Sequence, residues 1–148
     1  MPETKQVYIK SYGNEEELAK HLPDLSKANA EEIAIATAKI LNQCHATDIQ
    51  IIDVRGKSDV TDFYVLATAQ SGIQVQSISG TLEFMTTEKG LPPVRKEDLK
   101  SRVWAVLDYS SVLVHIMFRE SREFYNIEKL YADADRIIPV ESAEDTAL

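Results

Sequence analysis

Cysteine is almost absent from this chain of 148 residues, which contains only Cys44. A single cysteine cannot form a disulfide within the chain, and it argues against a metal site built on thiolates. Apolar runs of about 18 residues are absent too, so the sequence predicts no membrane-spanning helix. The N-terminus has neither the apolar segment of a signal peptide nor the arginine-rich character of a transit peptide. We therefore expect a cytoplasmic protein without membrane contact.

Basic residues are in deficit, with 16 Lys and Arg against 24 Asp and Glu, which gives a formal net charge of -8. Phosphate binding depends on clustered Lys and Arg, so this balance argues against sequence-specific or general binding of nucleic acid and favours a basic partner. Residues 132–148 hold five acids and one base, which is half of the net charge. We expect this tail to be solvated and disordered.

Glycine is scarce as well, with five residues, and the glycine-rich loops that hold phosphates in nucleotide-binding proteins are missing. The sharpest enzymatic alternative is a nucleotidyltransferase, which needs a Gly-Ser turn followed by two carboxylates at i and i+2 on one strand. Residues 56–59 (Gly-Lys-Ser-Asp) with Asp62 resemble this pattern only distantly, because the two acids are three residues apart. Asp133 and Asp135 do have the spacing, but they are expected to be solvated at the end of the last helix.

Histidine offers no better candidate for catalysis. His115 lies within an apolar run and is interpreted as a hydrogen-bonded core residue, and the other histidines, His21 and His45, have no acidic partner at ligand spacing. We therefore predict a protein that is not an enzyme and needs no metal or cofactor. A degenerate nucleotidyltransferase-like enzyme or a nucleotide-binding protein is kept as the alternative.

The clearest structural signal is a predicted β-hairpin. Two apolar runs, 103–107 and 112–118, are separated by the polar residues 108–111, which favour a reversal of the chain. The second run is apolar on both alternating faces, so it predicts a central strand that is covered on both sides. Ser121 can cap a following helix, in which Phe124, Ile127 and Tyr131 recur at helical spacing and pack back onto the hairpin.

The remaining pattern completes one domain. A helix is predicted from a capping box at Asn29 to about His45, strands at 49–54 and 62–69, a helix from 71 or 72 to Gly90, and a short edge strand at 94–96. This order predicts an α+β (α/β layered) fold with a mixed β-sheet flanked by helices. The predicted boundaries are a loose N-terminal extension at 1–28, the domain at 29–132 and the acidic tail at 133–148.

Trp104, the only tryptophan, is either a core anchor or the centre of a binding surface, since tryptophan is enriched in interface hot spots. Alternation places Trp104, Val106 and Asp108 on one face of their strand, and Tyr109 with its odd-numbered neighbours on the other. Arg122 either pairs with a carboxylate such as Asp108 or points outward to a partner.

The sequence resembles the ribosomal silencing factor family, also called Iojap-like proteins, over about residues 29–132. The resemblance rests on an ordered series of segments: 53–58 (DVRGKS), 61–68 (TDFYVLAT), 74–76 (QVQ), the hairpin with its tryptophan and Asp108-Tyr109, 114–116 (VHI) and 121–130 (SREFYNIEKL). Two positions depart from the family's pattern, Ser110-Ser111 at the hairpin tip and Tyr131 at the end of the last helix.

This resemblance implies a translational repressor that binds the large ribosomal subunit, through its ribosomal protein numbered fourteen, and sterically blocks joining of the small subunit under nutrient limitation. It implies a fold like that of a nucleotidyltransferase core without the active site. It also implies that the partner is contacted by the hairpin face, with Trp104, Val106, Asp108, Tyr109 and Arg122 as candidate binding residues. A homodimer is left open.

Overall fold

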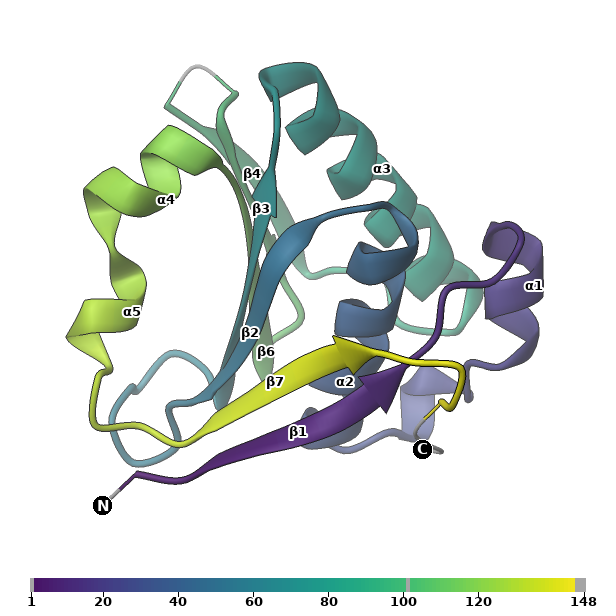
Figure 1. Cartoon of the computed structure of the whole chain (residues 1–148), viewed down its shortest axis with the longest axis horizontal. Coiled ribbons are helices and arrows are strands. Elements are labelled where there is room, and N and C mark those ends of the chain that lie inside the picture. The colour runs from purple at the N-terminus through teal and green to yellow at the C-terminus, as the bar shows by residue number, and fades with distance from the viewer. Residues whose placement is uncertain (1, 101, 146–148) are drawn as a thin grey trace.

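The computed structural model describes residues 2–100 and 102–145, which form a mixed seven-stranded sheet in the order β1-β7-β2-β3-β6-β5-β4 (Figure 1). The strands are β1 Thr4–Ile9, β2 Thr47–Asp53, β3 Phe63–Ala69, β4 Arg95–Leu99, β5 Trp104–Asp108, β6 Val112–Phe118 and β7 Arg136–Glu141. The helices are α1 Glu15–Lys20, α2 Ala30–Gln43, α3 Gly72–Glu88, α4 Arg119–Tyr125 and α5 Ile127–Leu130, with a 3-10 turn at Leu25–Lys27. The α+β fold class with a mixed, helix-flanked sheet is confirmed.

The predicted hairpin lies inside this sheet. β5 and β6 pair antiparallel, and β6 also pairs parallel with β3, so β6 is a central strand. At the tip, the Asp108 carboxylate accepts a hydrogen bond of 2.7 Å from the backbone N–H of Ser110, which has a left-handed φ of 71°. A short polar side chain that bonds its own backbone stabilises such a reversal. β4 is at the sheet edge, as the flanking prolines predicted.

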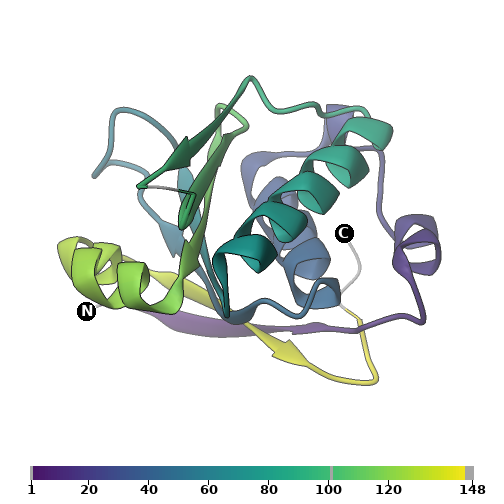
Figure 2. The same ribbon diagram turned by 90° about the horizontal axis from the view of Figure 1, so that it is seen from above.

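The two faces of the sheet are covered unequally. α2 and α3 lie on one face and α4 and α5 on the other (Figure 2). α2 begins with the predicted capping box of Asn29 and Glu32, and α3 is capped by Ser71. The main core lies under these two helices, whereas the other face has a small cluster made of Ile52, Val54, Leu66 and Ala134. The short helices α4 and α5 therefore cover only part of their face.

The last predicted helix is interrupted. Asn126 adopts a left-handed conformation with φ 45° and divides the segment into α4 and α5, and α4 begins directly after β6 without a side-chain cap from Ser121. Asparagine tolerates this conformation better than most residues. Phe124, predicted to pack back onto the hairpin in one helix with Ile127 and Tyr131, is 75% exposed.

The predictions of a loose extension and a disordered tail are wrong for residues 4–9 and 136–141. These segments form β1 and β7, which pair parallel at one side of the sheet, with β7 lying between β1 and β2. Val7, Ile9 and Ile137 are buried. Pro139 lies beyond the β7 residues that pair with β2, where a missing N–H is tolerated. The last three residues of the predicted tail lie outside the described residues.

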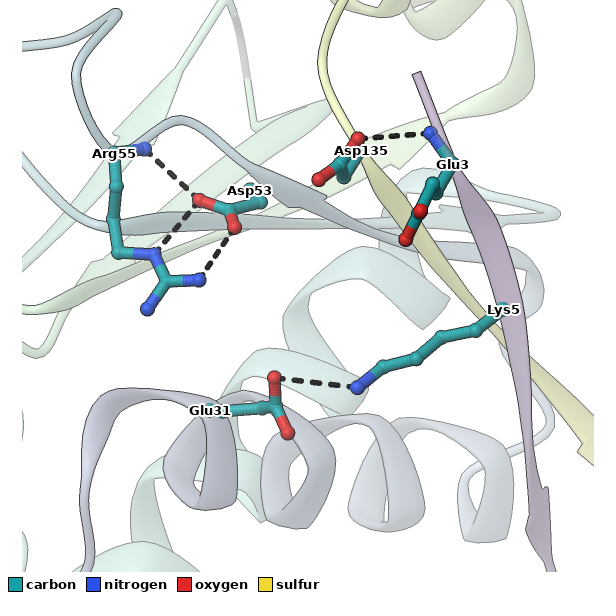
Figure 3. A network of polar contacts seen from close by, with 6 residues as sticks. All are labelled: Glu3, Lys5, Glu31, Asp53, Arg55 and Asp135. Carbon is teal, nitrogen blue, oxygen red and sulfur yellow. Dashed lines mark hydrogen bonds and ion pairs between the residues drawn. The ribbon is translucent and has the colours of Figure 1, made fainter. Parts of the chain in front are cut away.

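Polar contacts hold the start of β1 in place (Figure 3). The backbone N–H of Glu3 donates to the Asp135 carboxylate at 2.8 Å, and the Lys5 ammonium lies 3.5 Å from the Glu31 carboxylate of α2. The second contact is between exposed side chains and contributes little to stability. The buried side chains of β1 therefore contribute most of the free energy that holds β1 on the sheet.

The C-terminal segment is tied to the core by a buried ion pair. The Lys39 ammonium of α2 lies 3.1 Å from the Asp145 carboxylate, and the Lys39 side chain is only 2% exposed. Asp145 also accepts a hydrogen bond of 2.8 Å from the Tyr12 hydroxyl. Desolvation and, to a smaller extent, this hydrogen bond raise the pKa of Tyr12 to about 12. Tyr12 and Asp145 thus connect the segments that follow β1 and β7 with Lys39 of α2.

Asp145→Asn is expected to lower the free energy of unfolding by about 2 to 3 kcal/mol, because it removes the carboxylate beside a buried ammonium. Glu144→Gln makes the same charge change on an exposed neighbour and should alter stability by less than about 0.5 kcal/mol. Urea unfolding of both variants measures the difference. Equal stability of the two variants would show that the Lys39–Asp145 pair does not hold the C-terminal segment.

Candidate functional site

Trp104 lies half-buried on β5, on the face of the sheet that α4 and α5 cover incompletely. Its indole Nε1–H donates a hydrogen bond of 3.0 Å to Nδ1 of His115 on β6. Its ring centroid lies 4.9 Å from that of Tyr125 at the end of α4. Trp104 is neither a fully buried core residue nor an exposed anchor, because it is half-buried and its indole N–H is bonded inside the protein.

Exposed aromatic side chains continue the surface beyond Trp104. Phe124 is 75% exposed and its ring centroid lies 4.9 Å from that of Tyr125, which is 38% exposed. On the sheet, Val106 and Leu113 are half-buried and lie on the same face by strand alternation. We call Trp104, Val106, Leu113, Phe124 and Tyr125 the aromatic face. Contiguous apolar surface of this kind is typical of protein-binding sites.

The candidate residues Val106 and Asp108 lie where strand alternation predicted, on the same face as Trp104. Asp108 is half-buried at the rim, where it caps the hairpin turn and lies 3.9 Å from the Arg95 guanidinium. A carboxylate at the rim of an apolar surface suits a basic group on a partner. These two residues and Trp104 thus remain candidates for binding.

The other two candidates are interior residues, and the structure corrects them. Tyr109 is buried on the opposite face of the sheet, where its hydroxyl lies 2.9 Å from that of Thr86 on α3, and burial raises its pKa well above the ordinary value. Because the hairpin strand alternates, Tyr109 cannot share a surface with Trp104.

Arg122 is 5% exposed and does not point outward. Its Nε lies 3.3 Å from the Glu128 carboxylate, and its Nη1 donates to the Thr68 hydroxyl at 2.9 Å and to the backbone carbonyl of Asp48. The expected carboxylate partner is thus Glu128 rather than Asp108. Arg122 joins α4 to β2 and β3, and it supports the aromatic face without forming part of it.

Sequence reasoning missed the contribution of Phe124, because its spacing with Ile127 and Tyr131 suggested one continuous helix packed on the sheet. The left-handed residue Asn126 ends α4, so Phe124 and Ile127 belong to separate helices. An asparagine between two aromatic residues and an apolar one, at the centre of a short helical pattern, is the signal that would have indicated the break.

The acidic residues near the loop between β2 and β3 are either engaged in structural contacts or exposed. Asp53 binds Arg55 through both oxygens, at 3.0 and 2.6 Å, and these hydrogen bonds lower the pKa of Asp53 (Figure 3). Asp133 pairs with Lys57 at 3.1 Å, which lowers the pKa of Asp133. Asp59 and Asp62 are exposed on the loop between β2 and β3.

Within 2–100 and 102–145, no group of three or more His, Cys, Asp or Glu side chains could hold a metal ion. In the same ranges, no helix has the length and apolar character needed to cross a membrane.

A cavity of about 460 Å³ lies beside Arg122, between β2, β3 and α4. Its lining includes three carboxylates, Asp48, Glu123 and Glu128, and two guanidiniums, Arg119 and Arg122, which leaves one net negative charge. A triphosphate requires the opposite balance. The nucleotide-binding alternative thus finds no support in this cavity.

The fold and the aromatic face together have the features of a protein-binding domain, an α+β sheet with a one-sided apolar surface. Comparisons with known proteins specify the family. Residues 27–147 match the family model described as "Ribosomal silencing factor during starvation". The chain belongs to this family, and the resemblance stated from the sequence is confirmed, with the match extending through β7.

Individual relatives agree with the family model. The chain is 34% identical over 119 residues to the chloroplastic protein Iojap of Zea mays, covering 80% of this chain and 50% of that protein. It is 30% identical over 106 residues to the ribosomal silencing factor RsfS of Bacillus subtilis, covering 72% of this chain and 90% of the relative. The chain thus spans about half the length of the maize protein and most of the bacterial one.

Solved structures share the fold. A crystal structure of a protein from Chromobacterium violaceum is similar with a TM-score of 0.68 at 26% identity, over 71% of this chain and 88% of that one. A crystal structure from Bacillus halodurans gives a TM-score of 0.60 at 27% identity, over 70% of this chain and 95% of that one. Both similarities show that this chain has the fold of those two proteins.

His115 should make the stability of the protein depend on pH. Burial lowers the pKa of His115 to about 4, from an ordinary value of 6.5. As the pH falls below 6.5, the unfolded chain takes up a proton at this residue that the folded chain does not, so the free energy of unfolding decreases. This group alone should account for a loss of about 2 kcal/mol between pH 7 and pH 5.

Urea unfolding of the parent and of His115→Leu at pH 7 and pH 5 measures this contribution. The variant lacks the titrating group, so its stability should change by about 2 kcal/mol less than that of the parent over the interval. An identical pH dependence in the two proteins would show that His115 titrates as it does in the unfolded chain.

Proposed function

We propose that this protein represses translation by binding the large ribosomal subunit through its aromatic face and sterically preventing the small subunit from joining, mainly under nutrient limitation. The single observation that carries the proposal is the aromatic cluster of exposed Phe124 and Tyr125 beside half-buried Trp104, in a chain of the ribosomal silencing factor family. Aromatic residues of this kind dominate the binding energy of protein interfaces. The family resemblance implies that the contacted component is the large-subunit protein numbered fourteen.

The charge of the chain supports a basic protein surface as partner rather than exposed RNA. With a net charge of -8, the protein is attracted to clustered Lys and Arg and repelled by phosphates. Asp108 offers a carboxylate at the rim of the aromatic face, where a basic side chain of the partner can pair with it.

This mechanism needs no chemistry. A protein that occupies the surface where two subunits meet blocks their association by its volume alone, and its effect depends on its affinity and concentration. We therefore propose that the protein has no catalytic activity and needs no cofactor. We also propose that it acts in the cytoplasm.

Phe124→Ala tests the surface directly. Because the side chain is 75% exposed, its removal should change stability by less than about 0.5 kcal/mol. Affinity for purified large subunits, measured by sedimentation, should fall about tenfold or more, which corresponds to about 1.4 kcal/mol. The variant should also inhibit joining of small and large subunits only at correspondingly higher concentration.

Phe84→Ala is the matched control, since Phe84 is 64% exposed on α3, on the opposite side of the sheet (Figure 2). It should sediment with large subunits as the parent does. Loss of binding in Phe84→Ala with full binding in Phe124→Ala would place the contact on the other side of the molecule.

A further inference from the structure

His115 is buried in a way that its role as a core residue does not explain. It is 7% exposed, and within the described part of the chain its Nε2 has no hydrogen-bond partner. A polar group that is buried without a partner is destabilising, and an apolar side chain of similar size would fill the same space without that penalty. The one hydrogen bond that the ring makes is with Trp104.

That hydrogen bond determines the tautomer of His115. An indole N–H can only donate, so Nδ1 of His115 must present its lone pair, and the proton of the neutral imidazole is assigned to Nε2. The ring of Tyr64 on β3 lies edge-on to His115, with centroids 5.3 Å apart, and limits its movement on the other side. His115 is therefore held with its acceptor aimed at β5.

The same bond determines what Trp104 can offer a partner. The indole ring is held between His115, with centroids 5.8 Å apart, and Tyr125, at 4.9 Å. Because the only polar atom of the indole is engaged inside the protein, a partner meets the apolar and electron-rich ring surface and no hydrogen-bond donor. Ring surfaces of this kind bind aliphatic side chains and the cationic groups of Lys and Arg.

We propose that His115 is a positioning residue for the aromatic face: by accepting the Trp104 indole N–H at Nδ1, it fixes the ring in the orientation that binds the partner, and it leaves Trp104 to recognise an aliphatic or basic side chain without donating a hydrogen bond. This inference rests on the proposed function. An indole without this acceptor would rotate to satisfy its N–H with water or with the partner, and the ring surface would be lost.

Two variants of nearly equal shape separate positioning from packing. His115→Leu removes the acceptor and fills the core with an apolar side chain. His115→Asn has the same branching and places an amide oxygen near the position of Nδ1. If His115 only fills space, His115→Leu should bind large subunits as well as the parent does. If it positions Trp104, His115→Leu should bind about tenfold more weakly, and His115→Asn should recover most of the loss.

The orientation of the ring has its own readout, because Trp104 is the only tryptophan and gives a single indole N–H signal in a ¹⁵N spectrum. In the parent this proton should exchange slowly with solvent, and its chemical shift should remain typical of a hydrogen-bonded indole when large subunits are added. His115→Leu should shift the signal and speed its exchange, whereas His115→Asn should resemble the parent. The melting temperatures of both variants confirm that they are folded.

A double-mutant comparison completes the test. In a Trp104→Phe background there is no indole N–H to hold, so His115→Leu should cause no further loss of affinity. The proposal is overturned if His115→Leu binds as the parent does, or if it weakens binding equally in both backgrounds. Failure of the parent to bind large subunits would overturn the proposed function instead, and the indole signals would still decide whether His115 holds the ring.

Discussion

Strand β6 carries apolar side chains on both of its faces, and the chain supplies long helices for only one of them. α2 and α3 bury the face of Val112, Val114 and Ile116, whereas the opposite face has only the short helices α4 and α5. The apolar side chains that these helices leave uncovered include those of β5, the strand next to β6 in the sheet. Apolar side chains that cannot be buried within the domain are stabilised by contact with another molecule, and the aromatic face lies where that contact is available.

The buried residues around this face serve to keep it rigid. Arg122 connects α4 to β2 and β3 through Glu128, Asp48 and Thr68, so Phe124 and Tyr125 are presented from a fixed helix. His115, on the neighbouring strand, accepts a hydrogen bond from the indole N–H of Trp104. A surface whose side chains are already ordered loses less conformational entropy on binding, and more of its contact energy appears as affinity.

Local patterns were sufficient to predict much of the fold. The hairpin, the capped helices α2 and α3 and the edge position of β4 follow from alternation, capping residues and prolines that are close together in the sequence. β1 and β7 could not be predicted in this way, because both are short and they pair with each other across more than a hundred residues. The acidic composition around β7 suggested disorder, although Ile137 fills a place in the core.

For the candidate site, alternation placed Trp104, Val106 and Asp108 on one face and Tyr109 on the other, as the structure has them, and Tyr109 was a candidate only through the family resemblance. Arg122, for which the sequence left open an ion pair or an outward position, pairs inside with Glu128, whereas Phe124, expected to pack onto the hairpin, is exposed. The αL conformation of Asn126 ends α4, so Phe124 does not share one continuous helix with Ile127 and Tyr131. Periodicity alone does not contain that information.

Amide hydrogen exchange of the protein, free and bound to purified large ribosomal subunits, tests the central claim most directly. We expect binding to slow exchange in residues 104–108 and 119–126, which carry the aromatic face, and to leave α3 unchanged. Protection confined to α3, with 104–108 and 119–126 exchanging as in the free protein, would contradict the account.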